Sequence, residues 1–180
     1  GISNITYIPA KGDPVAFDTG PGNALIDQWV WEKAGIAYDE GGKIAASGHV
    51  VRTVVDAYLA NPFFAKPGPK SLDRKDFDLT PVRALSLADG ARTLAAVTAE
   101  AIFRAVELLE EAPRLWILCG GGRKNPFILN DMKRLAESFS AGVESVSSVV
   151  KTADEVGVDG DSMEAEAWAY LAVRAAKGLP

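Results

Sequence analysis

The stretch of the sequence best suited to chemistry is residues 17–23, FDTGPGN, in which an apolar segment ends in a carboxylate and passes through two glycines. Glycine lets a backbone approach a phosphate closely, and the free amides at a helix start attract anions. Asp18 would not bind an anion itself; it would hold Mg²⁺ or act as a base towards a hydroxyl or water. Because Asp-x-Gly turns are common, an ordinary turn is an equally good interpretation of this stretch alone.

A second glycine turn, Gly120 to Gly122, follows the apolar run 115–119. Bare backbone at this turn can lie against a flat base. Asn125 and Pro126 come next, and they suit the cap and the first position of a helix that runs towards residue 138. The spacing fits neither G-x-G-x-x-G nor G-x-x-x-x-G-K-[ST], so these two common nucleotide signatures are excluded.

The elements that must position these turns follow from apolar periodicity and from turn residues. The expected strands are 2–8, 15–17, 115–119 and 143–150, and the expected helices are 23–34, 43–59, 89–109 and 161–177. Residues 62–81 contain four prolines and are expected to form a loop near the surface. The run 115–119 is expected to be a strand buried on both faces. This order predicts an α/β domain with a mixed sheet flanked by helices, whose ligands bind beyond the carboxyl ends of the strands.

Composition narrows the possible functions. The 180 residues, 48% of them hydrophobic, suit one globular domain. A net charge of −5 disfavours nucleic acid as a partner, since a polyanion binder needs clustered lysine and arginine. The single cysteine, Cys119, allows no internal disulfide, which favours the cytoplasm. We expect a soluble chain without a membrane span or signal peptide, and its start without Met suggests a processed or cut protein.

Four segments together resemble motifs of the anhydro-N-acetylmuramic acid kinase family, in the same order. They are residues 18–23 (DTGPGN), 69–71 with Arg74, 119–126 (CGGGRKNP) and 160–165 (GDSMEA). The resemblance spans almost the whole chain and implies a ribonuclease H-like lobe of the actin and hexokinase superfamily, in which two lobes close around ATP. It implies that residues 1–180 are the carboxy-terminal lobe, with a helical and proline-rich insertion at about 38–88. The Gly-Thr-Ser-x-Asp-Gly segment of the amino-terminal lobe is absent from the sequence, so we expect that lobe to be missing.

The implied reaction uses ATP and Mg²⁺ to phosphorylate the 6-oxygen of anhydro-N-acetylmuramic acid while water opens the anhydro bridge. The product is N-acetylmuramic acid 6-phosphate, an intermediate of cell-wall recycling. The resemblance also implies a homodimer, and half a kinase should not turn over sugar at a normal rate. Two alternatives stay open: a non-catalytic nucleotide-binding or oligomerisation domain, and a different actin-like sugar or acid kinase.

The resemblance assigns roles residue by residue. Asp18 is the base that activates the water. The glycines Gly120, Gly121 and Gly122 and the amide Asn125 contact adenosine, while Gly20, Gly22 and Asn23 face phosphate or sugar.

The remaining motif residues have two interpretations each. The family pattern puts Glu164 near the sugar and the catalytic water, but the run from Asp161 to Glu164 also fits a capping box, and both can hold. Lys70 and Arg74 either stabilise an anionic ligand or lie on an exposed loop. The family's usual form is Lys-Ser-Thr-Gly-Arg; here residues 72–73, Leu-Asp, replace Thr-Gly, which leaves the shape of this turn open.

Other residues that often carry chemistry suggest only structural roles. His49 is the only histidine and is expected on a helix without metal-ligand companions. Cys119 has no neighbouring histidine base and is expected to pack at the end of a buried strand. Core packing is the expected role of most of the four tryptophans.

Overall fold

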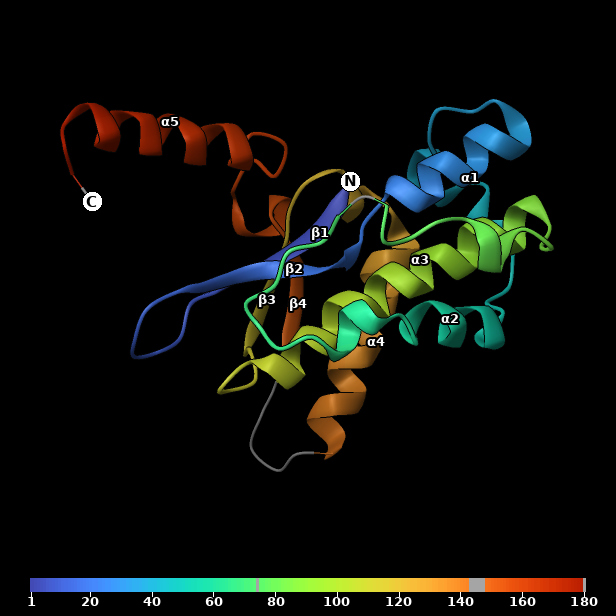
Figure 1. Ribbon diagram of the computed structural model, residues 1–180, viewed down its shortest axis with the longest axis horizontal. Helices are drawn as coiled ribbons and strands as arrows, with labels where there is room; N and C mark the ends of the chain where they lie inside the picture. Colours follow the sequence, from blue (N-terminus) through green and yellow to red (C-terminus); the bar gives the residue numbers. More distant parts are fainter. Residues whose placement is uncertain (74, 143–147, 180) are drawn as a thin grey trace.

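The computed structural model describes residues 1–73, 75–142 and 148–179, and all side chains within them except those of Gly142 and Glu164. A pair of strands comes first, a run of helices follows, and strands and helices then alternate to the end of the described chain (Figure 1). In order they are β1 (Ile2–Tyr7), β2 (Val15–Pro21), α1 (Ala24–Ala34), α2 (Arg52–Leu59), α3 (Leu87–Phe103), β3 (Leu115–Leu118), α4 (Pro126–Gly142), β4 (Val149–Thr152) and α5 (Met163–Ala176). The expected α/β class is therefore confirmed.

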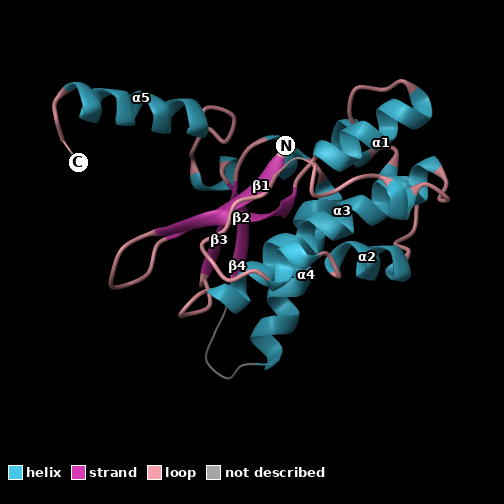
Figure 2. Ribbon diagram, viewed as in Figure 1, coloured by secondary structure: helices cyan, strands magenta, loops and turns pink. Residues whose placement is uncertain are grey.

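The strands form two pairs in the centre of the molecule (Figure 2). β1 and β2 are an antiparallel hairpin, whereas β3 and β4 are parallel. Among the described residues the two pairs are separate two-stranded sheets, so the expected single mixed sheet is not found. Alternating polarity predicts that a segment is a strand, but it does not specify which sheet edges pair. Of the strand expected at 143–150, residues 143–147 lie outside the described residues.

The larger core packs α1 against α3. Trp29 of α1 is 1% exposed, and its indole N–H donates to the carbonyl of Leu87 at 2.9 Å. Its ring lies where a Cβ on Gly90 would be, only 2.2 Å away, so α3 needs glycine at this position. α1 ends as the sequence predicts, because Gly35 adopts a left-handed conformation with φ 67°.

The smaller core lies between the β3–β4 pair and the helices α3 and α4. Trp116 and Val150 point into it and pack with Met132 and Ala136 of α4. The side chains at the alternate positions of β3 are exposed to solvent: Leu115 is 49% exposed and Ile117 is 44% exposed. The expectation that this strand is buried on both faces is wrong, because described helices cover only the Trp116 face.

Residues 38–88 depart most from the expected elements. The helix expected at 43–59 is reduced to a short 3₁₀ turn, Ala45–Ser47, followed by α2. Two contacts explain the break. The carboxylate of Asp39 accepts hydrogen bonds from the amides of Ile44 and Ala45, and Gly48 packs so tightly on α3 that a Cβ there would lie 2.1 Å from the carbonyl oxygen of Ala88.

The proline-rich segment 62–81 does not simply cover the surface. Phe63, Phe77 and Leu79 are 1%, 8% and 3% exposed and belong to the larger core. Phe63, Phe64 and Phe77 pack edge to face, with ring centroids between 5.4 and 6.1 Å apart. The expected surface position is therefore wrong for these residues, since aromatic packing draws the loop inwards.

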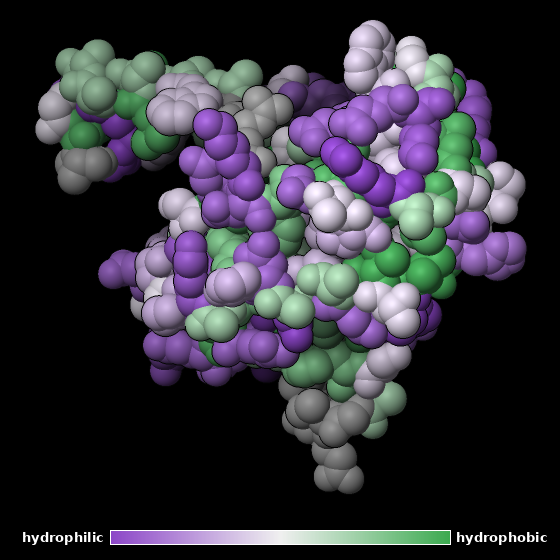
Figure 3. Space-filling view, turned by 45° about the vertical axis from the view of Figure 1, so that its right-hand side comes forward, coloured by the Kyte–Doolittle hydropathy of each residue, from purple (hydrophilic) through white to green (hydrophobic). Residues whose placement is uncertain are grey.

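α5 extends away from the rest of the molecule (Figure 1). Its apolar side chains face solvent, as the projecting helix at the upper left of Figure 3 shows; Trp168 is 64% exposed and Leu171 is 51% exposed. With Trp31 62% exposed as well, core packing holds for only two of the four tryptophans. No helix in the described ranges combines the length and the apolar character needed to cross a membrane.

Candidate functional site

Asp18 lies in the middle of β2, because this strand continues to Pro21 instead of ending at residue 17 as expected. It is held by the segment that carries the 69–71 motif. Its amide donates to the carbonyl of Lys70 at 2.9 Å, and its Oδ2 accepts a hydrogen bond from the amide of Leu72 at 2.8 Å. A pocket of about 350 Å³ opens beside it, lined by Asn4, Ile5, Ala16, Phe17, Asp18, Pro69, Lys70 and Ser71. The structure therefore brings two of the four sequence motifs together around one cavity.

The ammonium group of Lys70 is directed to backbone carbonyls. Nζ donates to the carbonyls of Phe63 at 3.2 Å and Lys66 at 3.3 Å and lies 4.6 Å from the centre of the Phe63 ring. Burial lowers the pKa of Lys70, and the neighbouring charges of Lys66 and Arg104 lower it further. Lys70 thus stabilises its own loop while lining the pocket, and its role towards substrate stays a prediction. Arg74 lies outside the described residues.

Gly20 and Gly22 are required by the packing of the fold. Gly20 has φ +153°, and a Cβ on it would lie 2.8 Å from the Cβ of Ala101 in α3. A Cβ on Gly22 would lie 2.8 Å from the carbonyl oxygen of Gly1, and the hydroxyl of Thr98 donates to the Gly22 carbonyl at 3.1 Å. Close packing alone accounts for both glycines, and their predicted contact with phosphate stays a prediction.

The second glycine turn has a different character. Gly120 has φ +68°, which favours glycine for conformational reasons. Gly121 is exposed and Gly122 half-exposed, and neither has positive φ. Among the described residues, a Cβ on either would meet only the side-chain amide of Asn23, at 3.8 and 3.7 Å. Packing therefore does not explain glycine at 121 and 122. The same distances bring the turn after β2 and the triple-glycine turn together.

Asn23 sits at this junction with one polar atom unsatisfied. Its Oδ1 is buried and accepts no hydrogen bond from the described residues. An unpaired buried acceptor costs free energy, so a donor brought by a ligand or by water would stabilise the site. Asn125, 5% exposed, is already satisfied in part, because its Oδ1 accepts from the amide of Phe127 at 3.0 Å as the predicted cap of α4.

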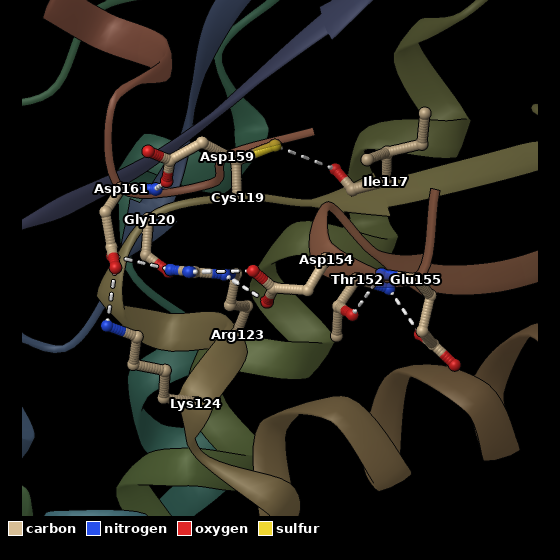
Figure 4. A network of polar contacts seen from close by, with 10 residues as sticks. All are labelled: Ile117, Cys119, Gly120, Arg123, Lys124, Thr152, Asp154, Glu155, Asp159 and Asp161. Carbon is tan, nitrogen blue, oxygen red and sulfur yellow. Dashed lines mark hydrogen bonds and ion pairs between the residues drawn. The ribbon is translucent and has the colours of Figure 1, made fainter. Parts of the chain in front are cut away.

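The fourth motif joins the triple-glycine turn from the other side. The amide of Gly120 donates to the carbonyl of Gly160 at 2.8 Å. The carboxylate of Asp161 accepts from Arg123 and Lys124, each at 2.7 Å (Figure 4). The hydrogen bond from Arg123 has the larger effect on the pKa of Asp161 and the one from Lys124 the next largest; together they hold this pKa well below its usual range.

Asp161 is consequently not the helix cap that the sequence suggests. α5 begins at Met163 with Ser162 as the capping residue, and the Ser162 side chain makes no capping hydrogen bond. The capping-box interpretation is wrong in this respect, because the Asp161 carboxylate is directed to two cations. The side chain of Glu164 lies outside the described part of the chain, so its role near sugar and water stays a prediction.

The sequence analysis missed Arg123, whose guanidinium is buried between Asp154 and Asp161. No local pattern signals that a charged residue directly after three glycines turns inwards. His49 lies outside any helix, contrary to expectation, with its side chain 92% exposed and Nδ1 3.7 Å from Asp89. Cys119 is half-buried after β3, and burial raises the pKa of its thiol. No group of three or more His, Cys, Asp or Glu residues suited to a metal ion occurs in the described ranges.

The motif order and this geometry agree with a comparison of the whole chain. Residues 1–180 match the family model described as anhydro-N-acetylmuramic acid kinase. The chain belongs to this family. Proteins named anhydro-N-acetylmuramic acid kinase are 49% identical in Agrobacterium fabrum (strain C58) and 50% identical in Rhizobium johnstonii, over 180 residues each. Both matches cover 100% of this chain and 46% of the relative, so the chain spans about half the length of the kinases it matches.

Proposed function

We propose that the full-length protein transfers a phosphoryl group from ATP to the 6-oxygen of anhydro-N-acetylmuramic acid while water opens the anhydro bridge. The product is N-acetylmuramic acid 6-phosphate, formed in the cytoplasm during cell-wall recycling. Membership of the kinase family supports this reaction. The observation that carries the proposal is the closeness of Asn23 to the triple-glycine turn: a Cβ on Gly121 or Gly122 would lie 3.8 or 3.7 Å from its side-chain amide, which brings the two glycine segments to one place.

The nucleotide is proposed to lie along the triple-glycine turn, with Asn125 beside it. The exposure of Gly121 and the absence of any packing reason for glycine at 121 and 122 support a close approach by a flat ligand. The phosphates would then lie towards Gly20 and Gly22. Mg²⁺ supplied with ATP neutralises phosphate charge, and Asp18 is the described carboxylate in the pocket beside β2 that is suited to it.

Asp18 is proposed as the base for the attacking water. The hydrogen bond from the Leu72 amide to Oδ2 fixes the orientation of this carboxylate, and none of the described residues donates a hydrogen bond to Oδ1. A fixed carboxylate with one oxygen available suits proton abstraction. The sugar is proposed to contact Asn23, Lys70 and Arg74, with Glu164 near the water.

Residues 1–180 are proposed to form the carboxy-terminal, ribonuclease H-like lobe of a two-lobed homodimeric kinase that is inactive without its other lobe. The share of the relatives that the chain covers supports one half of a longer kinase, and the absence of the Gly-Thr-Ser-x-Asp-Gly segment from the sequence supports the choice of the carboxy-terminal half. Mixing the chain with the amino-terminal half of the Agrobacterium fabrum relative should restore sugar-dependent ADP release. Robust turnover by the chain alone, or restoration by the carboxy-terminal half instead, would contradict the assignment.

The catalytic proposal is tested with Asp18→Asn in the full-length protein. Loss of a general base lowers kcat by about 10²- to 10⁴-fold, so sugar-dependent ADP release should fall by this factor. Asp13→Asn is the matched control, because Asp13 is an exposed carboxylate in the β1–β2 connection. Full activity of the Asp18 variant would remove the base from the proposal. A wild-type protein that binds ADP without sugar turnover would instead be a nucleotide-binding module.

A further inference from the structure

A charged side chain is buried beneath the triple-glycine turn. The side chain of Arg123 is only 4% exposed. Its Nε and Nη2 donate to the two oxygens of Asp154 at 2.7 and 3.2 Å, and Nη1 donates to Asp161 at 2.7 Å (Figure 4). Asp154 and Asp161 are themselves 60% and 53% exposed, so the carboxylates stay hydrated while the guanidinium lies inside. Paired, charge-assisted bonds of this kind fix a guanidinium in one orientation.

The same guanidinium also bonds the glycine turn itself. Nη1 donates to the carbonyl of Gly120 at 3.0 Å, and the amide of Gly120 donates to the carbonyl of Gly160 at 2.8 Å. Gly160 lies so close to the guanidinium that a Cβ on it would be 2.6 Å from Nε of Arg123. Arg123 therefore fills the space between two turns and bonds one of them directly, while Asp161 ties it to the other.

We infer that Arg123 is a positioning residue for the nucleotide: it holds the turn 120–122 and the turn 160–162 together as one wall of the site. This inference rests on the proposed function, because the nucleotide site at the glycine turn is part of that proposal. The guanidinium lies under the turn, so the exposed Gly121 faces the ligand and Arg123 acts through the backbone of Gly120. Because the two turns are already held in place, the nucleotide binds without the free-energy cost of ordering them.

Lysine cannot replace arginine here, because one ammonium group does not span two carboxylates and a carbonyl in a planar arrangement. The test therefore uses Arg123→Lys in the full-length protein. This variant keeps the positive charge but loses the planar guanidinium with its several hydrogen-bond donors. The KM for ATP and the Kd for ADP should rise about tenfold or more, which corresponds to one charge-assisted hydrogen bond, while the KM for the sugar stays unchanged. Arg134→Lys is the matched control, since Arg134 is 61% exposed on α4.

Asp161→Asn is the second variant, chosen because its half-exposed side chain tolerates substitution without loss of the fold. It should shift the ADP affinity in the same direction by a smaller factor. If both variants lose thermal stability but bind ADP within about twofold of wild type, Arg123 is only structural and the inference is wrong. If the wild-type protein itself binds no adenine nucleotide, by calorimetry, the proposed function fails and the inference falls with it.

Discussion

Gly121 and Gly20 offer a direct comparison between a glycine that we assign to a ligand and a glycine that the fold requires. Gly121 begins a 3₁₀ turn with no positive φ. Within the described part of the chain, the only neighbour of an added methyl would be the Asn23 amide at 3.8 Å, an ordinary contact. Gly121→Ala should therefore leave the free energy of unfolding unchanged or raise it by about 0.5–1 kcal/mol, because alanine loses less backbone entropy than glycine.

The effect on the ligand should be the opposite. A methyl group forced into a close contact costs about 1–3 kcal/mol, which corresponds to a weakening of nucleotide binding by about 5- to 140-fold. Gly20→Ala should instead lose stability, since its methyl would lie 2.8 Å from the Cβ of Ala101 at φ +153°. That variant should lose about 1–3 kcal/mol of stability through overpacking, with added backbone strain.

The assays are urea unfolding followed by tryptophan fluorescence, and calorimetric titration with ADP, both on the full-length variants. The prediction requires Gly121→Ala to be stable and weak in binding while Gly20→Ala is unstable. Wild-type ADP affinity in Gly121→Ala would refute the reasoning that this turn meets the nucleotide. A large loss of stability in Gly121→Ala would show that the fold, and not a ligand, demands glycine there.

Two further predictions concern charged residues. Asp131→Ala should destabilise the chain by about 3–5 kcal/mol, because it leaves the guanidinium of Arg92, between α3 and α4, without its bidentate partner. Urea unfolding measures this loss of stability. The double variant Arg92→Met with Asp131→Leu, which replaces both charges by apolar side chains, should recover much of it. The pKa of Asp161 is lower in the folded chain, so its contribution to stability is complete above the unfolded value of about 4 and is lost as the pH falls further. Urea unfolding at several pH values should therefore show the stability difference between wild type and Asp161→Asn shrinking below about pH 4, and a constant difference would contradict this.

The features that the sequence predicts correctly depend on neighbouring residues. The β1–β2 hairpin, the end of α1 at Gly35 and the start of α4 at Asn125 and Pro126 all follow from local conformational preferences.

The features that the sequence does not reveal depend on distant partners. The helix expected at 43–59 breaks at Gly48 because of Ala88, which is forty residues away in the chain. Arg123 turns inwards because Asp154 and Asp161 receive it, and the exposed Trp168 belongs to a helix that lacks a covering element among the described residues. Charge and hydropathy give the average environment of a residue type, whereas burial is decided by the tertiary contacts of each position.

The close approach of Gly160 to Arg123 links the evolution of two positions. A methyl at 160 would lie within 2.9 Å of Cδ and Cζ of Arg123 as well as near Nε, so alanine at 160 and arginine at 123 exclude one another in this arrangement. Family members with a side chain at 160 should therefore carry a shorter residue at 123, and such exchanges should occur together. A substitution at position 160 alone, without the matching change at position 123, would disturb the glycine turn, even though neither side chain faces the proposed nucleotide.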